Sequence, residues 1–209
     1  MSSSSPALAE AQVAVIVLAV ARERAADGKA LLAEPMAQGT VLTTTLRHVR
    51  ASGLPLTMVA DAVWRAELLR EGVALNELVT LAPEQAALGL AIAAGVTNRP
   101  NVAGWLVLPA DMPAVAPDTL RRLAQAVQEA HEAPMVYPEH RGQRGQPMGF
   151  AGELCADLLR LTDDDSVRRL LARFPTQPVP VPDAGVLVRV RQRAALATAQ
   201  RLQEIETSP

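Results

Sequence analysis

Leu106-Val-Leu-Pro-Ala-Asp111-Met-Pro113 is an apolar run that stops abruptly at an acid and a proline. Such a run predicts a buried strand with one carboxylate at its carboxyl end, which is where open α/β sheets present groups to a metal or a ligand. The alternative is that Asp111 caps the helix expected to begin near Asp118, but Asp111 lies too far before that helix to cap it directly. The carboxylate of Asp111 is therefore a candidate ligand-binding group.

Strand-like and helix-like segments alternate on both sides of this stretch. Short, continuous, β-branched runs predict buried strands, and helical patterns that end at a glycine predict capped helices. The expected strands cover residues 13–19, 56–60, 77–81, 104–108, 134–137 and 178–182. The expected helices cover residues 40–52, 62–71, 83–94, 117–132, 154–161 and 167–174, the first three ending at Gly53, Gly72 and Gly95. This alternation predicts an α/β fold with a doubly wound parallel sheet and helices on both faces.

In a sheet of this kind, ligands bind outside the carboxyl ends of the strands. That rule places three segments at one edge: the loop after Ala19, the loop of Asp111, and a turn over residues 142–149. Asp118 and Thr119 stand at the start of the helix that follows, where short polar side chains satisfy free backbone amides. The candidate site is therefore this edge of the sheet.

Length and composition predict one globular domain over residues 13–200, with loose tails at 1–12 and 201–209. Hydrophobic residues make up 49% of the chain and charged residues 20%, which is typical of a globular protein. Aromatic residues make up only 2%, so stacking platforms for single-stranded nucleic acid are not expected. The net charge of −2, without a dominant basic cluster, argues against nucleic acid as a partner.

The single cysteine, Cys155, excludes an intrachain disulfide and fits a reducing compartment. The apolar run at residues 13–21 is too short to span a bilayer, and the first residues lack the basic region of a signal peptide. We therefore expect a cytoplasmic protein with no membrane partner.

Four segments occur in a suggestive order: Leu18-Ala-Val-Ala-Arg-Glu-Arg-Ala-Ala-Asp-Gly-Lys29, Asp111-Met-Pro113, Arg144-Gly-Gln-Pro-Met-Gly-Phe150 and Asp163-Asp-Asp-Ser-Val-Arg168. Together they resemble the MobA-like NTP transferases, the molybdenum-cofactor cytidylyl- and guanylyltransferases, over nearly the whole chain. The resemblance implies a Rossmann-like, doubly wound, mostly parallel sheet of the nucleotide-diphospho-sugar transferase type. It also implies transfer of CMP or GMP from an NTP to the molybdenum cofactor, with Mg²⁺ held by two acids.

The same resemblance assigns roles to individual residues. Asp111 and Lys29 would be catalytic, and Asp111 would also hold the metal. Residues that would contact the nucleotide are Leu18, Ala19, Ala21, Arg22, Arg24 and Lys29. Residues that would contact the other substrate, a pterin-type compound, are Arg144, Gly145, Gln146, Pro147 and Arg168.

Four departures from the family pattern fall in this one site. Ala21 replaces a glycine that lets phosphate approach the backbone, and Glu23 replaces a serine with a group that repels phosphate. Ala91 lacks the hydroxyl of the family's nucleotide-contacting helix, so a plain buried helix is favoured there. Arg189 occupies the position of the second metal-binding acid, and a cation cannot coordinate a cation. The magnesium site is therefore expected to be incomplete.

Two function classes fit these observations. One is a nucleotidyltransferase whose activity is weak or lost, and the other is a non-catalytic protein that binds a nucleotide or another anion on the same fold. A related alternative is that Arg189 and Arg191 replace the metal and hold an anion directly, since arginine forks match phosphate oxygens. The acids at residues 163–165 either bind a metal or complement the dipole of the helix that follows, and the second interpretation is favoured.

Overall fold

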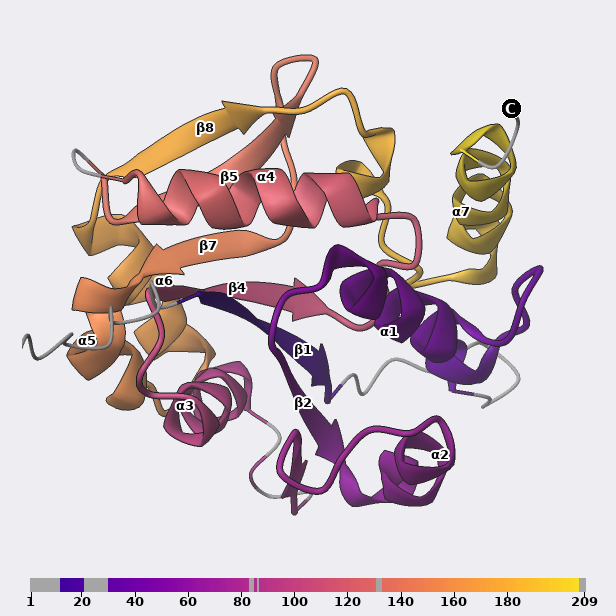
Figure 1. Ribbon diagram of the computed structural model, residues 1–209, viewed down its shortest axis with the longest axis horizontal. Coiled ribbons are helices and arrows are strands. Elements are labelled where there is room, and N and C mark those ends of the chain that lie inside the picture. The colour runs from indigo at the N-terminus through magenta and orange to yellow at the C-terminus, as the bar shows by residue number, and fades with distance from the viewer. Residues whose placement is uncertain (1–11, 21–29, 83–84, 86, 131–132, 207–209) are drawn as a thin grey trace, which may run out of the picture.

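The structure is a computed structural model that describes residues 12–20, 30–82, 85, 87–130 and 133–206. They form a sheet of eight strands with helices packed on both faces (Figure 1). The strand order is β3-β2-β1-β4-β7-β5-β6, and β8 pairs with β5 on its other side. The strands are β1 (Val13–Ala19), β2 (Leu56–Asp61), β3 (Leu78–Leu81), β4 (Gly104–Pro109), β5 (Met135–His140), β6 (Gln143–Arg144), β7 (Met148–Ala151) and β8 (Thr176–Pro180).

The central strands are parallel, and their register aligns their carboxyl ends. Val15 of β1 lies opposite Leu56 of β2 and Leu106 of β4, so β1 and β4 end together beside the loop that carries Asp111. β7 runs antiparallel to both β4 and β5, whereas β8 runs parallel to β5. The sheet is therefore mostly parallel and Rossmann-like, as the sequence predicts.

The helices divide between two faces because side chains alternate along each strand. Val15 and Val17 of β1 pack in a core with α1, α2, α4 and α7, whereas Ile16 and Leu18 pack in a second core with α3, α5 and α6. The helices are α1 (Val41–Ser52), α2 (Arg65–Arg70), α3 (Leu88–Asn98), α4 (Pro117–Gln128), α5 (Cys155–Leu159), α6 (Asp164–Arg173) and α7 (Arg193–Glu206). The 3-10 turns are η1 (Leu31–Ala33), η2 (Ala62–Trp64), η4 (Gly152–Leu154) and η5 (Ala184–Leu187).

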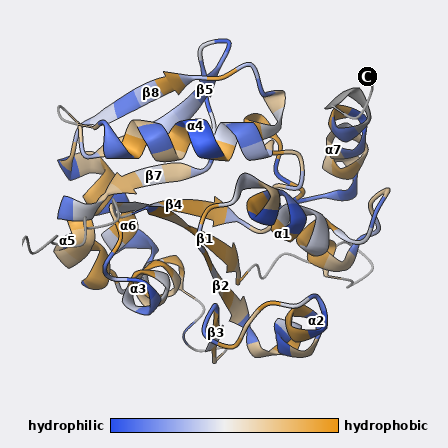
Figure 2. Ribbon diagram, viewed as in Figure 1, coloured by the Kyte–Doolittle hydropathy of each residue, from blue (hydrophilic) through white to orange (hydrophobic). Residues whose placement is uncertain are grey.

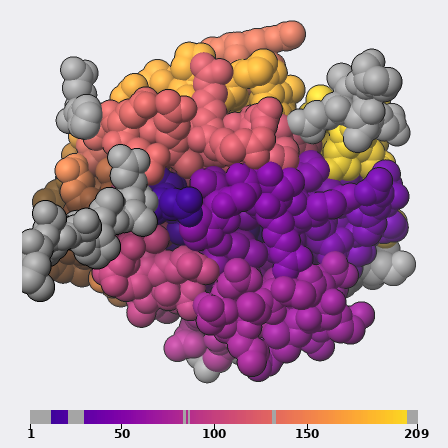
Figure 3. Space-filling model, viewed as in Figure 1, coloured from indigo at the N-terminus to yellow at the C-terminus, as the bar shows by residue number. Residues whose placement is uncertain are grey.

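Burial follows this layering. Figure 2 shows the central strands as hydrophobic, while α4 carries both hydrophobic and hydrophilic residues. In the space-filling view, the surface on this side comes mainly from the α1, α2, α3 and α4 regions, with a small indigo patch at the start of β1 (Figure 3). None of the helices described is long and apolar enough to cross a bilayer.

The edge strands differ from the sequence prediction. Residues 142–149 were expected to form a turn, but they contribute β6 and the first part of the antiparallel strand β7. β7 packs closely on its neighbours, because a Cβ added at Gly149 would lie 2.5 Å from Val136 Cγ2. Its pairing depends on these contacts between distant segments, which local sequence patterns do not reveal.

Helix α3 also differs from its prediction. It begins at Leu88 and continues to Asn98, so Gly95 lies inside the helix and does not cap it. A Cβ at Gly95 would lie 2.5 Å from Ile16 Cγ2. The glycine therefore serves the close approach of α3 to β1, and the prediction of a helix end at this residue was wrong.

The start of α4 is capped from a distant part of the chain. Asp118 and Thr119 were expected to satisfy its free amides, but Asp183 accepts a hydrogen bond from the Ala116 N–H at 2.9 Å. Asp183 also accepts from the Thr119 hydroxyl at 2.7 Å and from the Gly185 N–H at 2.7 Å. One carboxylate therefore ties the start of α4 to η5.

The C-terminal helix α7 extends beyond residue 200, the expected end of the domain, and continues to Glu206. Gln203 lies on this helix, and its side-chain amide donates to the Pro113 carbonyl at 2.9 Å. Ala199 of the same helix is fully buried in the core. The helix therefore packs on the segment that follows Asp111, and its last turns belong to the domain.

Candidate functional site

Asp111 follows β4 directly and is almost completely buried, with 3% of the residue exposed. Hydrogen bonds from distant residues fix the main chain around it. The Thr45 hydroxyl donates to the Ala110 carbonyl at 2.9 Å, and the Val190 N–H donates to the Asp111 carbonyl at 2.8 Å. The second bond places residue 189 directly beside the Asp111 carboxylate.

The carboxylate of Asp111 is held by a two-pronged ion pair with Arg189. Arg189 Nε donates to Asp111 Oδ1 at 3.0 Å and to Oδ2 at 3.1 Å, and Arg189 Nη2 donates to Oδ2 at 2.8 Å. The Arg189 side chain is 31% exposed, so the guanidinium lies between the buried acid and solvent. Bidentate arginine–carboxylate pairs of this kind are among the stronger ion pairs that proteins form.

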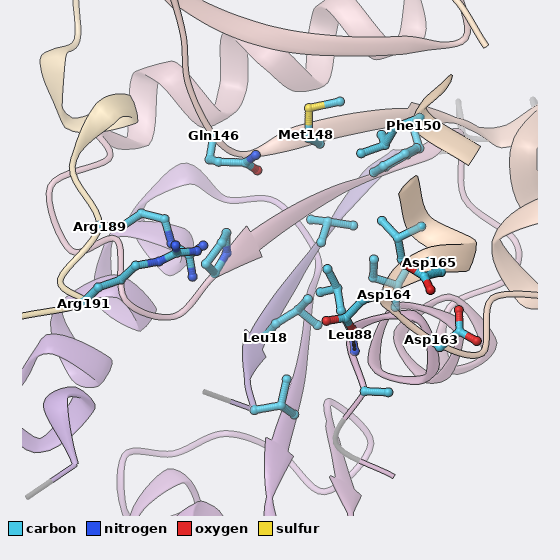
Figure 4. A pocket seen from close by; sticks show the side chains of 17 residues that line it. Leu18, Leu88, Gln146, Met148, Phe150, Asp163, Asp164, Asp165, Arg189 and Arg191 are labelled. Carbon is cyan, nitrogen blue, oxygen red and sulfur yellow. Dashed lines mark hydrogen bonds between the residues drawn. The ribbon is translucent and has the colours of Figure 1, made fainter. Parts of the chain in front are cut away.

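A cleft of about 680 Å³ opens beside this pair (Figure 4). Arg189 and Arg191 reach into it from the same side, and the acids of α6 lie on the opposite side. The wall between them is mainly apolar and comes from β1, β4, β7, α3 and α6. The lining residues are Leu18, Val20, Ala87, Leu88, Ile92, Val107, Pro109, Gln146, Met148, Phe150, Asp163, Asp164, Asp165, Val167, Leu171, Arg189 and Arg191.

The acids on the far side are engaged in holding two helices together. Asp163 is the N-cap of α6 and forms a capping box with Ser166, whose N–H donates to it at 2.6 Å. This hydrogen bond holds the pKa of Asp163 below its usual value, so the group is ionised at neutral pH. Asp164 accepts from the Leu88 N–H, the first amide of α3, at 3.1 Å. These contacts agree with the predicted role of complementing a helix dipole.

The turn before β7 positions Gln146 at the cleft. The Gln146 N–H donates to the Val186 carbonyl at 2.9 Å, and the Gln146–Pro147 peptide bond is cis. Gly145 lies against η5, because a Cβ there would be 2.7 Å from the Val186 carbonyl oxygen. Of the three predicted substrate-binding residues in this turn, Gln146 lines the cleft.

Leu18 and Ala19 lie at the end of β1 on opposite faces of the sheet. Leu18 lines the cleft, and Ala19 is fully buried in the core on the other face. The remaining predicted phosphate-loop residues lie outside the described residues: Ala21, Arg22, Arg24 and Lys29.

Arg144 and Arg168, which were also predicted to bind the second substrate, contact other side chains of the protein. The Arg144 guanidinium lies 4.4 Å from the centre of the Tyr137 ring, which fits a cation–π contact. Arg168 forms an exposed ion pair with Asp165 one helical turn away. Neither arginine lines the cleft.

The donor groups beside Asp111 do not fit a divalent metal. Mg²⁺ prefers oxygen ligands such as carboxylates, and here Arg189 engages both carboxylate oxygens of the single acid. Among the described residues, no group of three or more His, Cys, Asp or Glu side chains is arranged to hold a metal ion. The acids of α6 lie across the cleft from this pair (Figure 4).

Sequence reasoning missed part of this cleft. Residues 87–95 were interpreted as a plain buried helix, but Ala87, Leu88 and Ile92 line the cleft. Met148 and Phe150 were matched to a family motif without an assigned role, and both line it too. Apolar residues at a strand end or in a first helical turn pack in cores far more often than in clefts, so the sequence carried no distinguishing signal.

A family model described as the MobA-like NTP transferase domain matches residues 14–179 of the chain. No curated protein matches the sequence of this chain. Among solved structures, Rv0371C from Mycobacterium tuberculosis, in complex with manganese, is 23% identical with a TM-score of 0.72, covering 92% of this chain and 99% of that one.

Molybdopterin-guanine dinucleotide biosynthesis protein A from Archaeoglobus fulgidus is 17% identical, with a TM-score of 0.69 and coverage of 92% of this chain and 100% of that chain. The 4-diphosphocytidyl-2C-methyl-D-erythritol synthase from Anaerococcus prevotii is 11% identical, with a TM-score of 0.66 and coverage of 93% and 96%. At these identities the three likenesses establish a shared fold.

Proposed function

Because the chain belongs to the MobA-like NTP transferase family, we propose that its cleft binds a nucleotide and that its metal-dependent nucleotidyl transfer is weak. The observation that carries this proposal is the ion pair between Arg189 and Asp111. In the sequence resemblance, residue 189 is the position of the second metal-binding acid. A guanidinium there neutralises the remaining acid and repels a divalent cation at the same place.

The nucleotide itself has a suitable environment. Leu18, Ile92 and Phe150 supply apolar surface for the flat faces of a base, and the arginines on one side supply charge for its phosphates. Lys29 would add positive charge from the predicted phosphate loop. The metal site and the phosphate loop, where Ala21 and Glu23 depart from the family pattern, would weaken transfer, while the apolar surface for the base is retained.

For the second substrate, the resemblance suggests a pterin-type acceptor of the kind used in molybdenum-cofactor maturation. Gln146 is the predicted acceptor-binding side chain that lines the cleft, so we assign it this role. Gly145 and Pro147 would position it through their packing, and we leave Arg144 and Arg168 out of the acceptor site.

Pyrophosphate exchange tests the weak-transfer proposal. With labelled pyrophosphate, CTP or GTP, Mg²⁺ or Mn²⁺, and a phosphorylated pterin-type acceptor to carry the nucleotidyl group, we expect the unmodified protein to exchange label only marginally above a protein-free control. The reason is that metal charge stabilisation, a contribution of several kcal/mol in such reactions, is largely lost. Rapid exchange that requires the divalent ion and disappears in Asp111→Asn would contradict the proposal.

A further inference from the structure

The geometry points to a cleft that binds the phosphate groups of its ligand directly on Arg189 and Arg191, without a divalent cation. This inference rests on the proposed nucleotide-binding function and specifies how that ligand is held. The two side chains enter the cleft from the same side (Figure 4). Guanidinium groups therefore bind the phosphate in place of a metal ion.

Arg189 retains donors that can face a ligand. A guanidinium carries five N–H donors. The contacts with Asp111 use the Nε–H and one Nη2–H, which leaves the second Nη2–H and both Nη1–H groups, three in all. No other described residue accepts a hydrogen bond from Arg189. These three donors belong to a side chain that lines the cleft.

The ion pair also fixes where those donors point. Asp111 is buried and anchored through its main chain to Val190, so it acts as a rigid base for the guanidinium of Arg189. An arginine that is already oriented loses little conformational entropy when an anion binds. Asp111 thereby becomes a positioning residue for Arg189, instead of a metal ligand.

Charge supports an anionic ligand at this side of the cleft. Arg189 and Arg191 each bring a guanidinium to this side, while the acids of the lining, Asp163, Asp164 and Asp165, lie on the opposite side. A chelator removes a bound metal ion but does not remove a guanidinium group. Phosphate binding on this side should therefore be independent of added metal and of chelator.

Isothermal titration calorimetry tests this inference. The ligands are inorganic pyrophosphate, CTP and GTP, and each is titrated once in EDTA and once in excess Mg²⁺. We expect dissociation constants that agree within about threefold between the two conditions, because no metal takes part. Arg189→Gln and Arg191→Gln should each weaken binding by about tenfold, the effect of losing charged hydrogen bonds. Arg173→Gln, which removes the same charge from an ion pair with Asp157 outside the cleft, should leave the affinity unchanged.

The outcomes separate the two proposals. Binding that requires Mg²⁺ and is abolished by EDTA overturns metal-free recognition and leaves nucleotide binding intact. Failure of pyrophosphate and both nucleotides to bind under either condition overturns the proposed function as well. If Arg189→Gln does not fold, the exposed Arg191→Gln variant decides, and unchanged pyrophosphate affinity in that variant contradicts the inference.

Discussion

In the presence of the phosphorylated acceptor, Arg189→Asp is expected to raise magnesium-dependent pyrophosphate exchange by about a hundredfold over the unmodified protein, because it supplies the second acid of the family's metal site. The substitution removes the Arg189 guanidinium that pairs with the Asp111 carboxylate and places a second carboxylate beside it. Two acids without a cation repel each other, so the folded variant should gain thermal stability when Mg²⁺ or Mn²⁺ is added. Initial rates of label exchange and melting temperatures with and without metal are the measurements.

Arg189→Asn is the matched control for this substitution. It has the same size as the aspartate variant but no carboxylate, so it should release Asp111 without creating a metal site. Exchange by Arg189→Asn equal to that of Arg189→Asp would show that removal of the guanidinium alone explains the gain. No gain in a folded Arg189→Asp variant that binds the metal would contradict the proposal that Arg189 limits transfer.

The Asp183→Ala variant should lose about 2–3 kcal/mol of unfolding free energy, because one carboxylate caps α4 and orders η5. The variant loses hydrogen bonds from the Ala116 N–H, the Thr119 hydroxyl and the Gly185 N–H. For a protein of this size, such a loss lowers the melting temperature by about 5–10 °C. Urea denaturation and calorimetry measure both quantities.

Asp118→Ala is the control at the same helix end. Asp118 is 88% exposed, and among the described residues its side chain pairs only with Arg121, so its loss should change stability by less than about 0.5 kcal/mol. Equal losses in the two variants would contradict the assignment of the cap to Asp183. Because η5 leads to Arg189, Asp183→Ala should also weaken pyrophosphate binding, whereas Asp118→Ala should not.

The sequence predicts the parallel half of this fold well, because those strands are buried on both faces. β1 and β4 are continuous apolar runs whose length and β-branched residues distinguish them from helices. The position of Asp111 follows from the end of such a strand. Gly53 ends α1 in the left-handed conformation that the glycine at this position predicts.

Contacts between distant segments are the part that local patterns do not predict. Asp111 and Arg189 are 78 residues apart, and only comparison with a family motif indicates that the two positions belong to one site. Asp183 followed by Ala-Gly indicates a local turn, which forms, but nothing nearby indicates that the same carboxylate caps α4. β7 is short, contains a glycine and depends on pairing with β4 and β5.

Manganese binding measured by electron paramagnetic resonance tests the central claim most directly. The unmodified protein, titrated with Mn²⁺ in the presence of CTP, should hold no more of the ion than CTP alone, while Arg189→Asp should hold one further ion per chain. A tight Mn²⁺ site in the unmodified protein that is lost in Asp111→Asn would contradict the account, since the carboxylate would then be available to metal despite its arginine partner.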